Sequence, residues 1–300
     1  MPNTPSLAVI LSIWGLDPVA LGAIAAAAAL YLAGVARVHR RGGTWPLHST
    51  LLFLLLGLGS YAVVTFSILG VYSGGLRWAF TTRIALLLLA VPPAIAAGRP
   101  IALLQASLGE AGRARVGRIL ASRAVRIFGN AMFGAVFSAA LFALFLTPVA
   151  GVARGTPWIG AALTVAVPLV GLLMVLPIAE DTANRSSLFI TAEFLLAFVE
   201  LLIDAIPGIV LRLSPAILDH GPRIVMALGW WPSPLRDQQL AGDLLWCIAE
   251  GADLPIIVLL LLRWARSDKR ESKKFDELTD EQLEELNREH LARWREGHGA

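Results

Sequence analysis

With 300 residues, of which 56% are hydrophobic and only 16% charged, the chain is far more apolar than a soluble domain, which averages about 45–50% apolar and 25% charged residues. Its mean hydropathy of +0.68 therefore indicates a polytopic membrane protein. The net charge of +3 lies in short connections between apolar segments, so it is interpreted as a topology signal and nucleic-acid binding is not expected. The single cysteine, Cys247, excludes an intramolecular disulfide and a cysteine-based metal cage.

The first third of the chain is expected to cross the membrane three times. Residues 6–16 are too short to span and are predicted to lie at the interface, anchored by Trp14. The first 18 residues carry no Lys or Arg, which argues against a cleavable signal peptide. Spanning helices are predicted at residues 18–38, 50–72 and 78–97, and Pro92-Pro93 should break the third.

The next connection is strongly basic. It sets six arginines against one acid, Glu110, and they are Arg99, Arg113, Arg115, Arg118, Arg123 and Arg126. Its apolar residues suggest a helix lying on the membrane surface; they are Leu103, Leu104, Leu108, Val116, Ile119 and Leu120. Such a segment either binds anionic lipid headgroups or serves only as a topology signal, and the sequence leaves both interpretations open.

The remaining spans are predicted at residues 127–149, 158–178, 188–211 and 240–262, with a Pro/Trp-rich loop at 214–236. A membrane domain is thus expected over residues 1–266. Residues 267–300 form a charged tail, in which Thr279 and Gln282 fit the capping box of one amphipathic helix. The predicted fold is an all-α, polytopic membrane helical bundle of about seven transmembrane helices.

Arg and Lys residues also predict the orientation. They gather in the connections after the first, third and seventh predicted helices, and basic residues favour the cytoplasmic side. The N-terminus is therefore predicted outside and the C-terminus in the cytoplasm.

Carboxylates in the last two predicted spans are the candidate site. They are Glu193, Glu200, Asp204, Asp243, Glu250 and Asp253. Steps of seven and four, then seven and three, place each set of three on one helix face. Asp204 is expected near the depth of Asp243, and Arg83 is the main candidate to balance the charge.

Three interpretations of this cluster remain open. Intramembrane carboxylates often mark a proton or cation pathway. Protonated acids can also join helices through hydrogen bonds. Alternatively, the cluster meets a polar patch on another membrane subunit.

No sequence motif indicates an enzyme. The chain has no G-x-S-x-G, no Walker loop and no H-E-x-x-H. A copper site in the carboxylate cluster is disfavoured, because Cu(I) prefers sulfur and Cu(II) readily takes imidazole, and all five histidines lie outside the predicted spans.

Ordered short motifs over residues 13–264 resemble the CtaG-type cytochrome c oxidase assembly factors. The resemblance rests on Trp14, Asp17-Pro18, residues 30–35 (LYLAGV), Trp45-Pro46, Pro92-Pro93, Gly98-Arg99-Pro100, and Asp237-Gln238-Gln239-Leu240-Ala241-Gly242 with Trp246. It implies about seven spanning helices and a role in delivering copper to, or maturing, a haem-copper oxidase in the bacterial cytoplasmic (inner) membrane. Family members usually have histidines near the turn between the second and third helices and after a glutamate in the sixth; here residues 67–75 have none, and Phe194 follows Glu193.

Three functions therefore compete. The leading hypothesis is a membrane-embedded assembly or accessory protein for a respiratory or other redox complex, including copper delivery. The alternatives are a resident structural subunit of a respiratory or photosynthetic complex, and a cation or proton transporter that uses the intramembrane carboxylates.

Overall fold

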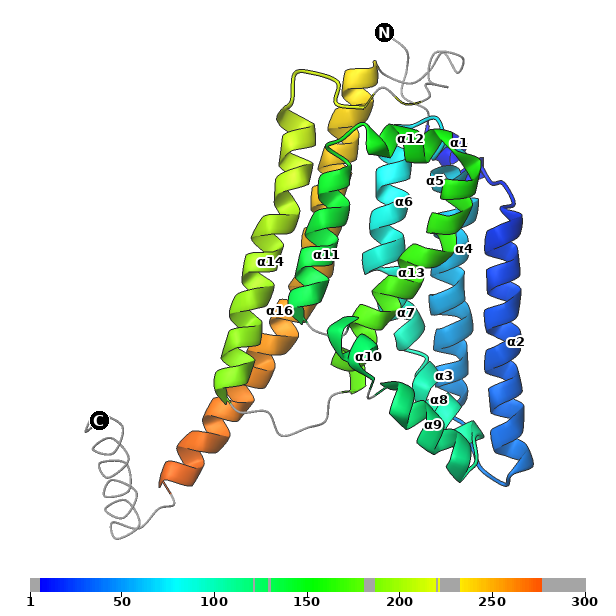
Figure 1. Cartoon of the computed structure of the whole chain (residues 1–300), viewed down its shortest axis with the longest axis vertical. Helices are drawn as coiled ribbons and strands as arrows, with labels where there is room; N and C mark the ends of the chain where they lie inside the picture. The colour runs from blue at the N-terminus through cyan, green and yellow to red at the C-terminus, as the bar shows by residue number, and fades with distance from the viewer. Residues whose placement is uncertain are drawn as a thin grey trace.

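The computed structural model describes residues 6–120, 122–128, 131–180, 187–219, 221 and 233–276. In these ranges every regular element is a helix (Figure 1). Four helical stretches are long and apolar enough to cross a membrane, Pro18–Arg40, Leu47–Phe66, Arg77–Ala96 and Pro157–Val175, and a bent pair would make a fifth. The predicted all-α membrane protein is thus confirmed, with four to five candidate spans in the described part of the chain.

The first span begins where the sequence predicts. Short helix α1 (Leu7–Ser12) leads to Trp14, whose side chain is 57% exposed. Helix α2 (Pro18–Arg40) then starts because the Asp17 carboxylate accepts the N–H groups of Val19 and Ala20 at 2.9 and 3.2 Å. This cap, followed by proline at the first helical position, is a strong helix start.

The second span is shorter than predicted. Its helix consists of α3 (Leu47–Leu51), the π-helical η1 (Leu52–Leu58) and α4 (Gly59–Phe66). Ser67 is extended and caps the separate α5 (Ile68–Val71) with its hydroxyl, while its backbone pairs with Trp14. The predicted single helix over 50–72 is therefore wrong beyond Phe66, because Ser67 supplies both a break and a new cap.

Helix α6 (Arg77–Leu89) and helix α7 (Val91–Ala96) form the third span, with the break at Ala90. The prediction of a break at Pro92-Pro93 is confirmed, since proline removes hydrogen bonds within the helix and disfavours a helical residue before it. Gly171 of α13 lies against this break: a Cβ there would approach the Leu88 carbonyl oxygen to 2.5 Å. The kink thus lies where another helix crosses closely.

Three short helices follow, α8 (Pro100–Ser107), α9 (Glu110–Leu120) and α10 (Arg123–Phe128). Figure 1 shows α8 and α9 at the end of the bundle where α2 finishes.

The next span is bent. Helix α11 (Ala131–Leu144) ends before Pro148, and α12 (Val149–Gly155) continues at 76° to it. The helix predicted over 127–149 is therefore wrong beyond Leu144, and residues 129–130 near its start lie outside the described residues. Helix α13 (Pro157–Glu180) then runs back through the bundle (Figure 1).

The last two long helices, α14 (Ser187–Leu213) and α16 (Pro234–Asp276), lie side by side (Figure 1). They cross where Gly208 meets Gly242: a Cβ on Gly242 would lie 2.5 Å from the Gly208 carbonyl oxygen. Small residues permit such close helix packing in membranes. Helix α16 continues past residue 266 to Asp276; the predicted tail helix at Thr279 and Gln282 lies outside the described residues.

Candidate functional site

Helix α6 is the enclosed centre of the bundle. Its residues from Arg77 to Ala85 are all buried, and its apolar side chains pack with residues of α4, α11, α13, α14 and α16 in the main hydrophobic cluster. Two arginines are therefore carried into the interior: Arg77 is 3% exposed and Arg83 is 5% exposed. Buried charges require partners, and each arginine organises a polar cluster.

Asp237 joins the start of α16 to the start of α6. Its two carboxylate oxygens accept the backbone N–H groups of Arg77 and Trp78 at 2.8 and 2.9 Å. The first N–H groups of a helix have no partner within the helix, and Leu76, at the capping position, offers no side-chain hydrogen bond. A residue 160 positions later in the chain therefore supplies the cap of the central helix, where a negative charge is also favoured by the helix dipole.

Gln238, fully buried, extends this contact. Its Oε1 accepts from Arg77 Nη1 at 2.6 Å and from the Leu218 N–H at 2.9 Å, and its amide donates to the Ala216 carbonyl at 2.9 Å. Arg77 Nη2 donates to the Phe145 carbonyl at the end of α11. One glutamine and one arginine thus tie α6, α11, α16 and the segment after α14 together.

A buried ion pair completes the cluster. Arg154 of α12 donates from Nε and Nη2 to one oxygen of Asp219 at 3.1 and 2.7 Å, and the other oxygen accepts the Gly221 N–H at 2.6 Å. Gly151 lies against this ion pair and leaves no room for a side chain, because a Cβ on residue 151 would lie 2.0 Å from the Asp219 carboxylate. We call these five residues the arginine clasp: Arg77, Arg154, Asp219, Asp237 and Gln238.

The clasp is electrically balanced, because two arginines face two aspartates. Burial raises the pKa of Asp237, which precedes the predicted span of α16, whereas the N–H groups of Trp78 and Arg77 and the two arginine charges lower it. The hydrogen bonds to both carboxylate oxygens suit the ionised form. The clasp therefore holds four helices together, α6, α11, α12 and α16.

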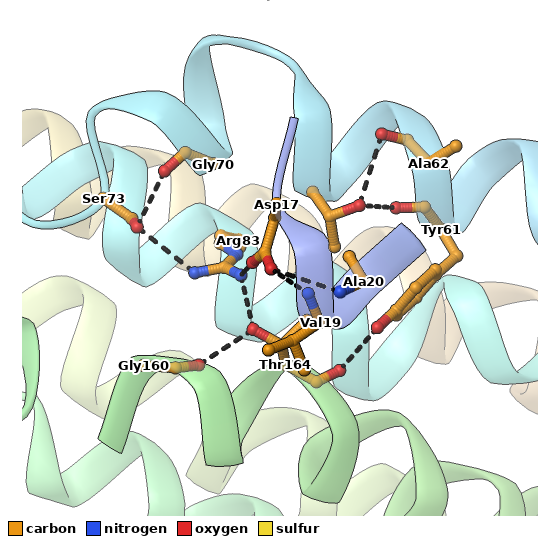
Figure 2. A network of polar contacts seen from close by, with 11 residues as sticks. Asp17, Val19, Ala20, Tyr61, Ala62, Gly70, Ser73, Arg83, Gly160 and Thr164 are labelled. Carbon is orange, nitrogen blue, oxygen red and sulfur yellow. Dashed lines mark hydrogen bonds and ion pairs between the residues drawn. The ribbon is translucent and has the colours of Figure 1, made fainter. Parts of the chain in front are cut away.

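Arg83 lies at the centre of a second cluster, the Arg83 network. In Figure 2 its guanidinium is surrounded by Asp17, Ser73 and Thr164. Arg83 Nη2 donates to Thr164 at 2.6 Å and approaches Asp17 at 3.5 Å, and Tyr61 donates to the Thr164 carbonyl at 3.0 Å. Among the described residues, the acidic partner of Arg83 is thus Asp17, which caps α2, and not Asp204, Asp243 or Glu250 of the last two predicted spans.

The six predicted carboxylates lie on α14 and α16, and the structure describes the side chains of Asp204, Asp243 and Glu250. Asp243 forms an ion pair with Arg212 at 3.0 Å, and Glu250 accepts a hydrogen bond from Trp246 one turn earlier. Asp204 is 1% exposed, and its Oδ1 has no hydrogen-bond partner among the described residues. The side chains of Glu193, Glu200 and Asp253 lie outside the described part.

The expected depth of Asp204 is wrong. Because the neighbouring Gly242 packs against Gly208 and Arg212, Asp243 lies level with residues four to eight positions, or about 6–12 Å, along α14 from Asp204. Arg212 lies just beyond the span predicted at 188–211, whereas the structure includes it in α14.

The clasp was also missed, apart from the motif that contains Asp237 and Gln238. Arg77 and Arg154 fall in the connections between predicted spans, yet both are buried. An arginine at the start of an apolar helix is a usable signal, because it requires a partner.

The other motif residues have separate positions. Pro92 and Pro93 start α7, Gln239 accepts a hydrogen bond from Arg236 at 3.4 Å, and Trp246 is 42% exposed. In the described ranges no three His, Cys, Asp or Glu side chains converge as metal ligands.

Comparison with known proteins adds relatives and a family. An uncharacterized protein of Mycobacterium bovis and one of Mycobacterium tuberculosis are each 24% identical over 301 aligned positions, covering 96% of this chain and 45% of the relative. An uncharacterized protein of Mycobacterium leprae is 24% identical over 292 positions, covering 93% and 44%. The chain thus spans less than half the length of these curated relatives. No solved structure matches.

The sequence model of the cytochrome c oxidase caa3 assembly factors, CtaG, matches residues 29–267. This range contains Pro92-Pro93 and the Asp237-Gln238-Gln239 motif, and it includes α6 and the whole arginine clasp. The predicted resemblance is confirmed, and the chain belongs to the CtaG family of cytochrome c oxidase assembly factors.

Proposed function

We propose that this chain is a membrane-embedded assembly factor for a haem-copper oxidase in the bacterial cytoplasmic membrane, and that it acts by contact with the assembling complex and not as an enzyme. The observation that carries the proposal is the family match over residues 29–267. The mycobacterial relatives support a bacterial setting, and the candidate spans support a site of action among membrane lipids.

The proposed topology has about seven spans with the N-terminus outside and the C-terminus in the cytoplasm. Helices α14 and α16 hold 27 and 43 residues. At about 1.5 Å per residue both exceed the roughly 30 Å hydrocarbon core. Reporter fusions after Arg41, Gly155 and Asp276 test this arrangement. A cytoplasmic signal at the first and third sites and an external one at the second are expected, and any other pattern contradicts it.

The hydrogen bonds of Asp237 and Gln238, two residues of the family motif, support action by contact. Both oxygens of Asp237 and both ends of the Gln238 amide bond to other parts of the chain. These side chains position helices, so their place in the family motif is accounted for by architecture. Delivery of copper to the oxidase, with the ion as cargo, is a more specific alternative within the same assembly role.

Deletion of the gene in its native host tests the assembly role and separates contact from copper delivery. We expect loss of assembled oxidase, measured by its haem spectrum and oxygen consumption, and restoration by the wild-type gene. Added copper should not restore the oxidase if the defect is one of contact. Restoration by copper would favour delivery of the ion, and an unchanged oxidase would contradict the assembly role altogether.

Purification in mild detergent supplies an independent test. The tagged chain should carry oxidase subunits with it from cells in which the oxidase is being made. Isolation without them, under conditions that keep the chain folded, would count against a contact mechanism.

Proton or cation transport is the second candidate, favoured by Asp204. This carboxylate is 1% exposed and has an oxygen without a partner in the described part of the chain, and buried ionisable groups in membranes often mark ion pathways. Flux into vesicles should fall in Asp204→Asn and Glu250→Gln variants if the site conducts. Glu200→Gln extends the test to the same predicted face, and unchanged flux in all three variants would refute transport.

A further inference from the structure

Helix α9 lies apart from the packed bundle. None of its residues is buried, and its main contacts are with its neighbours α8 and α10. Figure 1 shows it at the end of the bundle where α2 finishes and α3 begins. Neither the clasp nor the Arg83 network uses it, so its composition needs another explanation.

The helix has one apolar side. At about 100° per residue, Val116, Ile119 and Leu120 fall within an arc of about 100°. Ile119 is 57% exposed. Arg113 and Arg115 flank this arc on its two sides, and both are exposed. Long arginine side chains in such positions can keep the charge in the polar headgroup layer while their stems lie along apolar surface.

The surrounding surface is basic. Exposed arginines at this end of the described chain face one exposed acid, Glu110; they are Arg37, Arg40, Arg41, Arg99, Arg113, Arg115, Arg118 and Arg123. The ion pairs that the structure shows among the described residues involve none of them. Arg113 donates from Nε to the Leu108 carbonyl at 3.3 Å, which leaves its other donors available.

We propose that α9 binds anionic phospholipid headgroups and lies in the plane of the membrane surface, with Ile119 directed into the acyl region and Arg113 and Arg115 on phosphate groups. The unpaired basic surface supplies the charge complementarity. An exposed apolar arc flanked by arginines is the form of an interfacial helix, whereas an acidic protein partner would need the charge but not the apolar arc. A lipid surface therefore accounts for both observations.

Each arginine near an anionic surface contributes about a fivefold change in binding. The double variant Arg113→Gln with Arg115→Gln should therefore weaken binding of α9 to an anionic membrane surface by about 25-fold at low ionic strength. Added salt should reduce this difference between the wild type and the variant. Arg118→Gln is the matched control. It removes the same charge from the same helix on the side away from the apolar arc, so its effect should be smaller than that of Arg115→Gln.

The test uses the full chain reconstituted into nanodiscs of phosphatidylcholine alone or mixed with phosphatidylglycerol. With Cys247 replaced by serine, a spin label is placed at Ile119→Cys or at Ala114→Cys, which lies on the opposite side of α9. Relaxation by oxygen reports lipid contact, and relaxation by a water-soluble nickel complex reports contact with water.

We expect the label at position 119 to be in lipid and the label at 114 in water, with the depth at 119 greater in anionic membranes. The double arginine variant should remove that lipid dependence, and glycerol phosphate added to phosphatidylcholine discs should not reproduce it. Equal water access at both positions, an unchanged depth on adding anionic lipid, or protection of position 119 from both reagents would overturn the proposal. An effect of glycerol phosphate would assign the site to a free phosphate compound.

Discussion

Removal of the Asp237 carboxylate should destabilise the protein more than removal of a comparable acid on the same helix. Asp237→Ala takes away two hydrogen bonds from buried N–H groups at the start of α6. An unsatisfied buried donor costs about 1–3 kcal/mol, and Arg77, 3% exposed, loses a nearby negative charge. The expected loss is therefore about 3–5 kcal/mol. Asp237→Asn keeps one acceptor oxygen and should lose roughly half as much.

Asp243→Ala is the matched control, because Asp243 lies on the same helix and its ion pair with Arg212 has side chains 39% and 41% exposed. Such a pair contributes about 0–1 kcal/mol. Thermal unfolding of the purified variants in one detergent, followed by circular dichroism and by loss of the monodisperse peak, makes the comparison. An apparent Tm for Asp237→Ala that is no lower than that for Asp243→Ala would refute the capping argument.

Two further predictions concern contacts that hold the bundle together. The single variants Arg154→Met and Asp219→Asn should each lower the free energy of unfolding by about 3–5 kcal/mol, because the partner is left buried and unpaired. The double variant should lose less stability than the two single losses added together. An additive loss in the same unfolding assay would contradict direct coupling between the two residues. Gly242→Ala should separate α14 from α16 and lower the Tm, since a Cβ at residue 242 would lie 2.5 Å from a backbone oxygen. Gly251→Ala is the control, because a Cβ at residue 251 would have no atom within 4 Å and should leave stability nearly unchanged. Equal Tm values for the two alanine variants would contradict the close crossing.

Local signals account for the part of the fold that could be predicted. Asp17-Pro18 before a long apolar run predicts the start of α2, and Pro92-Pro93 predicts the break before α7, because capping and proline effects act within a few residues. The bend between α11 and α12 has a weaker signal. Pro148 stands near the predicted end of that span, and only the structure shows that the chain turns by 76° there.

The partners in the clasp could not be predicted, because they are far apart in the chain. Arg77 and Asp237 are separated by 160 residues, and Arg154 and Asp219 by 65. Helical periodicity describes which residues share a face of one helix, but it does not say which helices are neighbours. For the same reason the sequence suggested Arg83 as a partner for distant acids, when Asp17 was the residue beside it.

The capping of α6 by Asp237 has a consequence for how the protein is made. Ribosomes deliver the chain from its N-terminus, so α6 enters the membrane long before the residue that satisfies its first N–H groups. Until α16 is inserted, the start of the central helix and the Arg77 side chain lack these partners. A nascent chain that stops before residue 237 therefore has unsatisfied polar groups at the start of the central helix α6. Membrane quality-control proteases could use these groups to distinguish unfinished molecules from complete ones.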